Sequence, residues 1–462
     1  MPNADSLRRV LLPAVFVLLI ACWLGGGATE EPRAIDEWLL LLSLPVLVLA
    51  VATHLSEVGA PRGLVRLGVA AALLIAAVPA LQLLPLGQGA QLGEARQALA
   101  VDLAVAGVGA NTRWTLSPEA TERALWALLP ALAMFLGALA LPAKQRRRLL
   151  QLLLVLVLVN VAVAFFQAGL PRDSSLRLYP DFIGGFGGLL VNTNHQGTAL
   201  IIGMVLATGL ALEARLRAGA GKADAHRPWW YAALAVACLL LVPLSTSRAA
   251  MVIALPALAV TLALAGGLRL ARITRSKRSA LLAVGIGALA IIGVRAALGW
   301  MAVDQAEELR HIIAGATLQA GQAHAPLGSG IGSFTAAFEA LAPPSLWLPR
   351  YVNHAHNEFA QWWLTGGWWA MLALGCVLVL LAVVAWRLLQ VQGRGRQAVI
   401  AAASFVAILA ALAHSWADYP LRTTTLMATV AALAGVLLAA LQQALERDEA
   451  RRHSPAISES GG

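Results

Sequence analysis

Two histidines separated by a single residue stand directly before a long apolar run, in the segment "NHAHNEFAQWWLTGGWW" at residues 353–369. Imidazole titrates near neutral pH, so His356 could take a proton from an attacking hydroxyl as a general base. The alternative is a structural role, in which a histidine caps the start of a helix or binds loop carbonyls. This role is the simpler interpretation for His354. The segment therefore offers a candidate base at the mouth of an apolar helix.

Four arginines stand beside apolar runs at predicted outer loops, namely Arg248, Arg310, Arg350 and Arg422. Arg248 lies in "STSRAA", a short link between two apolar runs that would hold it at the membrane surface. A guanidinium presents a planar fork that makes two parallel, charge-assisted hydrogen bonds, and it therefore suits a diphosphate. A single arginine in such a place can instead snorkel to lipid phosphates. Several arginines together with histidines favour an anion-binding site.

Another group of polar residues recurs near the end of the chain, in "HSWADYPLR" at residues 414–422. His414, Asp418 and Arg422 are spaced four residues apart. If the stretch were helical, one face would hold an ion pair beside an imidazole. Pro420 argues against an uninterrupted helix.

These motifs do not predict a metal or nucleotide site. "HAH" has no cysteine or HExxH companion, and Glu358 is adjacent to it rather than at helical spacing. The glycine string "GSGIG" at 328–332 lacks the GxGxxG and GK[ST] patterns, so it predicts a turn. We therefore expect neither a metal nor a cofactor.

The elements that must position these groups are membrane helices. The chain has 462 residues, 59% of them hydrophobic and 13% charged, and its mean hydropathy is +0.74. Apolar runs of about 20 residues predict transmembrane helices, whereas a β-barrel would show short alternating segments. The predicted fold class is an all-α polytopic membrane protein with about 12 transmembrane helices. These are expected at residues 10–25, 38–53, 66–84, 123–141, 149–168, 196–213, 229–244, 249–265, 280–298, 359–386, 398–415 and 424–443.

The basic residues set the predicted orientation. Most Lys and Arg residues, including all three lysines, fall in alternate loops, and the positive-inside rule places these loops and both termini in the cytoplasm. Loops held against anionic lipid also account for the net charge of +10 without nucleic acid, which is not expected as a partner. The expected parts are residues 1–148 with four spans, 149–298 with five, a periplasmic loop at 299–358, three spans at 359–443 and a disordered cytoplasmic tail at 444–462.

Four motifs, in the same order, resemble those of the O-antigen ligase and polymerase superfamily, whose members have about twelve membrane helices. They are "NTNHQGTAL" (192–200), "STSRAAMV" (245–252), "ELRHIIAGATLQAGQAHAPLGSGIGSF" (308–334) and "HAHNEFAQWWLTGG" (354–367). In the last, Gly367 follows Asn357 after nine residues, at the family's spacing. The resemblance covers roughly residues 150–440. Two departures are "WWAM" in place of the Gly-Thr expected after Gly367, which leaves acceptor specificity open, and an isoleucine pair after Arg310 where an aromatic residue is common.

The resemblance implies a GT-C-like, inverting and metal-independent glycosyltransferase of the bacterial inner membrane, with its active site facing the periplasm. Its donor would be a glycan on undecaprenyl diphosphate, and its acceptor either lipid A core (ligase) or another glycan chain (polymerase). Polysaccharide assembly proteins are expected as further partners. Carried over by position, Arg248 and Arg310 hold the diphosphate and His356 activates the acceptor hydroxyl. The residues expected to contact the substrates are Asn194, His195, His354, Asn357 and Arg422. The ending "HSWADYPLR" is slightly more similar to polymerases.

The residues alone point to the same chemistry, because two fixed cations stabilise the charge that grows on a leaving diphosphate. The main alternative is a transporter or flippase that moves an anion or a lipid-linked sugar without covalent chemistry. Transporters are commonly built from inverted repeats and carry polar groups at mid-membrane depth. The sequence has no clear repeat and, apart from Asn160, few polar residues within the predicted spans. A purely structural partner of a polysaccharide export complex is a third interpretation.

Overall fold

The computed structural model describes residues 4–29, 34–56, 63–86, 92–107, 109, 112–171, 173–179, 185–222, 226–266, 305–347, 351–391 and 395–453. Within these ranges the regular elements are all helices, which confirms the all-α class. The longer helices are α1 (Ala4–Gly25), α2 (Ala34–Leu55), α3 (Gly63–Gln82), α4 (Glu94–Val105), α5 (Pro118–Trp126), α6 (Leu129–Ala140), α7 (Ala143–Gly169), α8 (Thr193–Ala218), α9 (Arg227–Leu241), α10 (Arg248–Gly266), α13 (Gln305–His324), α15 (Glu358–Gln390), α16 (Arg396–His414) and α17 (Thr424–His453). The shorter ones are α14 (Phe334–Glu339), η1 (Val242–Ser245), η2 (Pro344–Leu346) and η3 (Pro420–Arg422).

Eleven segments of the described residues are long and apolar enough to cross a membrane, and each coincides with a predicted span. The chain is thus a multi-pass membrane protein. α5 and α6 together form the fourth segment, and α17 continues past residue 443 to His453. The span predicted at 280–298 and Arg350 lie outside the described residues.

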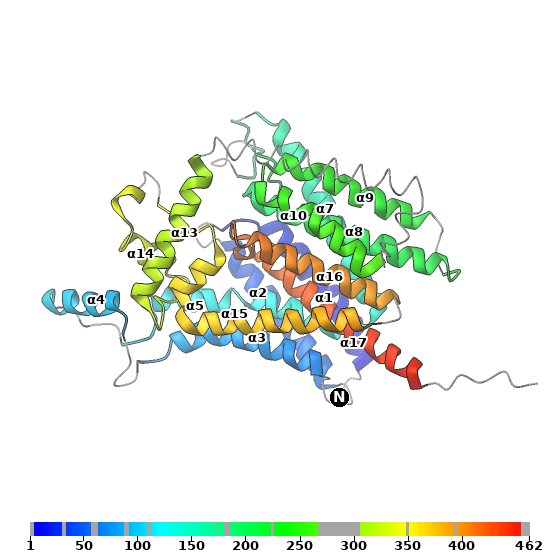
Figure 1. Cartoon of the computed structure of the whole chain (residues 1–462), viewed down its shortest axis with the longest axis horizontal. Helices are drawn as coiled ribbons and strands as arrows, with labels where there is room; N and C mark the ends of the chain where they lie inside the picture. The colour runs from blue at the N-terminus through cyan, green and yellow to red at the C-terminus, as the bar shows by residue number, and fades with distance from the viewer. Residues whose placement is uncertain are drawn as a thin grey trace, which may run out of the picture.

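Helix α8 lies at the centre of the packing, with 78% of its apolar stretch buried. Three of its glycines allow close approach of neighbouring helices. A Cβ at Gly197 would lie 2.6 Å from Ala250 Cβ of α10, one at Gly203 would lie 2.8 Å from Val157 Cγ1 of α7, and one at Gly209 would lie 2.4 Å from Ala403 Cβ of α16. Small residues at membrane helix interfaces permit this contact. Figure 1 shows α16 between α8 and α10 on one side and α15 on the other.

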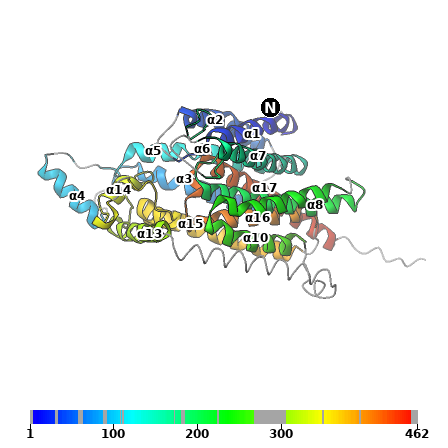
Figure 2. The ribbon, with the colours of Figure 1, turned by 90° about the horizontal axis from the view of Figure 1, so that it is seen from above.

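The two ends of this bundle differ in chemistry. At one end Arg147 of α7 pairs with Glu213 near the end of α8 at 2.8 Å, and Arg146 donates to Gln397 of α16 and Gln443 of α17 at 3.1 and 2.6 Å. The start of α8, the end of α16 and the start of α15 therefore lie at the opposite end. Beyond that end lie α4, α13 and α14, on the left of both views (Figure 1; Figure 2).

Helix α15 is broken at Gly367, where φ is +59° and ψ is −150°. The "GSGIG" loop packs into this break: Ser329 N and Gly330 N donate to the carbonyls of Leu364 and Thr365 at 2.9 and 2.8 Å. Gly328, Gly330 and Gly332 all have positive φ, so the predicted turn is confirmed. Only glycine adopts these conformations at little cost. The loop that follows α13 is thereby fixed to the segment of α15 that precedes Gly367.

Candidate active site

The "HAHN" segment is fixed by the start of α15. The side chain of Asn357 is the helix N-cap, and its Oδ1 accepts hydrogen bonds from Phe359 N and Ala360 N at 3.0 and 3.1 Å. Glu358 N donates to the carbonyl of Ser415, which ties this start to the end of α16. His356, immediately before the cap, has φ of +49°. A non-glycine residue in this left-handed region is uncommon and signals a conformation imposed by its surroundings.

His356 faces a buried carboxylate. Its Nδ1 lies 3.1 Å from Oδ1 of Asp418, whose residue is only 1% exposed. The other carboxylate oxygen, Oδ2, accepts from Asn192 Nδ2 at 3.2 Å. Burial alone would raise the pKa of Asp418, but the hydrogen bond with His356 and nearby positive charge, including that of Arg310, lower it below its usual value. Asp418 is therefore ionised and accepts from Nδ1–H, which leaves Nε2 of His356 as the nitrogen that can accept a proton.

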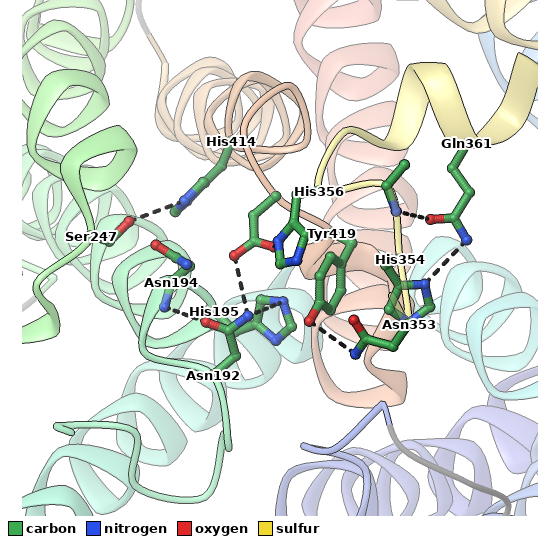
Figure 3. A network of polar contacts seen from close by, with 12 residues as sticks. Asn192, Asn194, His195, Ser247, Asn353, His354, His356, Gln361, His414 and Tyr419 are labelled. Carbon is green, nitrogen blue, oxygen red and sulfur yellow. Dashed lines mark hydrogen bonds and ion pairs between the residues drawn. The ribbon is translucent and has the colours of Figure 1, made fainter. Parts of the chain in front are cut away.

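Tyr419 lies among three imidazole rings. Its ring centroid is 4.3 Å from that of His354, 5.0 Å from that of His356 and 5.1 Å from that of His195. Figure 3 shows the ring between His195 and His356 on one side and His354 on the other. Burial and the charge of Asp418 raise the pKa of Tyr419 to about 12. The Tyr419 side chain is therefore uncharged, and its ring lies between the histidine rings. Its hydroxyl oxygen accepts a hydrogen bond from Asn353 Nδ2 at 3.4 Å.

His354 is held as a neutral ring. Gln361 Nε2 donates to its Nδ1 at 3.1 Å, and Gln361 Oε1 accepts from Ala355 N. Burial, with the charge of Arg422, lowers the pKa of His354 to about 3. The ring therefore carries its proton on Nε2 and supplies no positive charge, so any contact with substrate would be as a hydrogen-bond donor.

The start of α8 brings Asn194 and His195 to the same place. Asn192 caps this helix, since its Oδ1 accepts from Asn194 N at 2.8 Å, and its Nδ2 lies 3.5 Å from Nε2 of His195. His195 is 1% exposed, and in the described structure its Nδ1 has no hydrogen-bond partner. One cap residue thus connects the "NTNH" motif to Asp418.

His414, the last residue of α16, connects this group to the turn that precedes Arg248. Its Nδ1 lies 2.8 Å from Thr198 Oγ1. Its Nε2 lies 3.2 Å from Ser247 Oγ, a contact that Figure 3 shows. Thr246 has φ of +55°, and Ser247 Oγ accepts from Ala250 N as α10 begins. Arg248 is partly buried at the first position of α10.

Of the other predicted arginines, the two that the structure describes differ in their surroundings. Arg310 on α13 is partly buried, and its positive charge contributes to the lowered pKa of Asp418, so Arg310 lies within electrostatic reach of the cluster. Arg422 on η3 forms an ion pair with Glu358: its Nε lies 3.1 and 3.0 Å from the two carboxylate oxygens, and its Nη2 lies 2.9 Å from Oε2. Arg422 therefore fastens the start of α15.

The segment "HSWADYPLR" is not an uninterrupted helix, in agreement with the argument from Pro420. α16 ends at His414, turns follow, and η3 begins at Pro420, so Asp418 pairs with His356 and Arg422 with Glu358. The predicted residues of all four motifs otherwise meet at one end of the bundle. Sequence reasoning missed Asn192, Thr198, Ser247 and Tyr419, and it did not identify His356 as the partner of Asp418. Their only sequence signal was membership of the same motifs. Among the described residues, no three His, Cys, Asp or Glu side chains are arranged to hold a metal ion.

A family model described as O-antigen ligase matches residues 233–375. This match covers the Ser247–Arg248 turn, Arg310 on α13 and the start of α15 with His356. No curated protein matches the chain. The match confirms the predicted resemblance and supports a membrane glycosyltransferase of this type. The chain is therefore a multi-pass membrane protein whose residues 233–375 are similar to the O-antigen ligase family.

Proposed function

We propose that this protein moves a glycan from undecaprenyl diphosphate to an acceptor hydroxyl, with inversion at the anomeric carbon and without a metal. The observation that carries the proposal is the pairing of His356 with Asp418 at 3.1 Å, at a place where the charge of Arg310 acts on the same carboxylate. The family match supports the reaction class. The acceptor is either lipid A core or a second glycan chain.

His356 is the proposed general base. As the acceptor oxygen forms its bond to the anomeric carbon, its proton passes to Nε2 of His356, and the positive charge on the imidazolium is stabilised by Asp418 through Nδ1–H. A positioned base of this kind contributes about 10²–10⁴-fold in rate. The left-handed backbone at His356 and the Asn357 cap fix the direction of the ring.

Arg248 and Arg310 are the proposed diphosphate ligands. The bond between the anomeric carbon and the diphosphate oxygen breaks, the electron pair stays with that oxygen, and negative charge grows on the leaving group. Fixed cations stabilise this charge most when it is greatest, and removal of one such group costs about 10²–10³-fold in rate. Arg422 forms an ion pair with Glu358, so we assign it a structural role, which is to hold the start of α15 in place.

The reaction takes place on the periplasmic side in this proposal. The cluster lies at the end of the bundle opposite to Arg146 and Arg147, and basic residues mark the cytoplasmic ends of membrane helices. The lipid-linked donor, already in the bilayer, reaches this end without leaving the membrane, and its diphosphate bond supplies the driving energy.

The test is alanine substitution of Arg248, Arg310 and His356 in cells that make a defined surface glycan. Each variant is expected to lose long or ligated chains while membrane levels of the protein stay normal. His311→Ala and Arg123→Ala are matched controls, because both side chains are exposed and belong to none of the contacts above; both are expected to act as wild type. Wild-type glycan in all three test variants would overturn the proposal.

A further inference from the structure

We propose that His414 is a positioning residue that keeps Arg248 in register with the His356–Asp418 pair. The inference rests on the proposed function and extends it to a residue that contacts neither substrate nor the reacting atoms. His414 is 0% exposed, and its ring nitrogens lie within hydrogen-bond distance of two hydroxyls, that of Thr198 on α8 and that of Ser247 in the turn before α10. A polar ring at the end of a membrane helix is costly unless it is satisfied, and such residues commonly mark functional sites.

The hydrogen bonds around His414 form one consistent chain. Thr198 Oγ1 donates to the carbonyl of Asn194 at 3.3 Å, so it accepts from Nδ1–H of His414. Nε2 of His414 then accepts from the hydroxyl of Ser247, and Ser247 Oγ accepts from Ala250 N at 3.3 Å. With these assignments each of the two hydroxyls donates one hydrogen bond and accepts one, while Nδ1 of His414 donates and Nε2 accepts. The chain runs from the start of α8, through α16, to the start of α10.

The backbone of His414 holds the other part of the site. Its carbonyl oxygen accepts from Ala417 N and Asp418 N, both at 3.0 Å, and these bonds fix the turn that presents the Asp418 carboxylate. The side chain of His414 therefore fixes the turn before Arg248, while its main-chain carbonyl fixes Asp418, the partner of His356. The relative position of cation and base depends on this residue.

The turn before Arg248 also rests directly on α8. A Cβ at Gly197 would lie 3.1 Å from Ser245 Oγ and 3.2 Å from Ser247 Cβ. The missing side chain at Gly197 lets the turn lie close to α8. The hydrogen bond from Ser247 to the His414 ring then fixes the position of the turn along the axis of α8. Loss of the Nε2 bond removes the one side-chain link between α16 and this turn that the described contacts show.

The test compares two amide substitutions that keep different halves of the imidazole. The amide of His414→Gln reaches the position of Nε2 and can keep the bond with Ser247, whereas that of His414→Asn reaches only the position of Nδ1 and keeps the bond with Thr198. Because only Ser247 leads to Arg248, we expect His414→Gln to retain most activity. We expect His414→Asn to lose about 10²-fold in kcat/KM, as a reacting group displaced by about 1 Å does.

A double-mutant cycle with Arg248→Lys separates positioning from general damage. If His414 acts through Arg248, His414→Asn costs much less in the Arg248→Lys background than in wild type, because coupled residues are not additive. Ser404→Ala is the matched control, since Ser404 is equally buried on α16 and its hydroxyl has no partner in the described structure; its activity should equal that of wild type. Thermal unfolding of each purified variant checks the fold.

The outcomes of this inference and of the proposed function are distinct. Equal activities for His414→Gln and His414→Asn, or additive effects in the cycle, would overturn the role of His414 even where Arg248→Ala is inactive. Full activity of Arg248→Ala, Arg310→Ala and His356→Ala together would instead overturn the proposed function itself.

Discussion

Replacement of Asp418 by asparagine keeps the shape of the side chain and removes its charge, so it tests how His356 is held. The carboxylate accepts from two donors, His356 Nδ1–H and the Asn192 amide. Asn192 cannot turn its amide round without losing the cap bond from Asn194 N at 2.8 Å. The orientation that keeps both Asn192 bonds therefore points the oxygen of the new amide at Asn192 and its NH2 group at His356.

This orientation reverses the tautomer of His356. Nδ1 must now accept from the new NH2 group, so the proton moves to Nε2, the nitrogen that should receive the proton of the acceptor hydroxyl. The variant also loses the negative charge that stabilises the imidazolium. Since a positioned general base contributes about 10²–10⁴-fold, we expect Asp418→Asn to reduce kcat by a factor in that range. The fold should persist, because the number of hydrogen bonds is conserved.

The assay is the initial rate of glycan transfer by purified protein in lipid nanodiscs, with saturating lipid-linked donor and acceptor. Asp102→Asn on α4 is the matched control, because that side chain is exposed and its exchange should leave kcat unchanged. Thermal unfolding shows whether each variant is intact. A folded Asp418→Asn protein with the kcat of wild type would refute the assignment of His356 as a base oriented by Asp418.

Two further predictions concern stability. Gly367→Ala should lower the free energy of unfolding by about 1–3 kcal/mol or more, because φ is +59° and the new Cβ would lie 2.3 Å from the carbonyl oxygen of Pro326. Gly375→Ala, in the same helix, is the control and should leave stability unchanged, because nothing lies within 4 Å of its Cβ position. Equal melting temperatures for the two variants would contradict this prediction. Stability should also fall as the pH drops from about 6.5 toward about 3, because the unfolded chain protonates His354 at its ordinary pKa of 6.5 whereas burial lowers the folded pKa to about 3. The unfolding midpoint should depend less on pH in His354→Gln than in the wild-type protein. Identical slopes of midpoint against pH for the two proteins would show that His354 does not cause the pH dependence.

The membrane helices could be predicted because hydropathy is a local property. The run at 196–213 became α8, Thr193–Ala218, and that at 398–415 became α16, Arg396–His414. The turn at "GSGIG" was also predictable, because three glycines in five residues disfavour both helix and strand and favour a turn. Burial of polar residues at one end of the bundle follows from the motifs being placed beside span ends.

The pairings could not be predicted, because they join residues that lie far apart in sequence. Asp418 is 62 residues from His356, and His414 is 167 from Ser247. Four-residue spacing suggested that Asp418 would meet Arg422, but the helix ends at His414 and each side chain finds another partner. Asn357 was expected to contact substrate, and its side chain is used as the cap of α15; that capping function lets it hold His356 in place.

The break at Gly367 divides α15 into two mechanical parts. The segment from Glu358 to Gly366 is bonded to the glycine loop and to Ser415, while the longer segment from Trp368 onward is apolar and long enough to cross a membrane. Bilayers of different thickness tilt a membrane-spanning segment, and a discontinuity in the hydrogen-bond ladder absorbs that tilt. We therefore expect the alignment of His356 with its neighbours to depend little on the local thickness of the membrane.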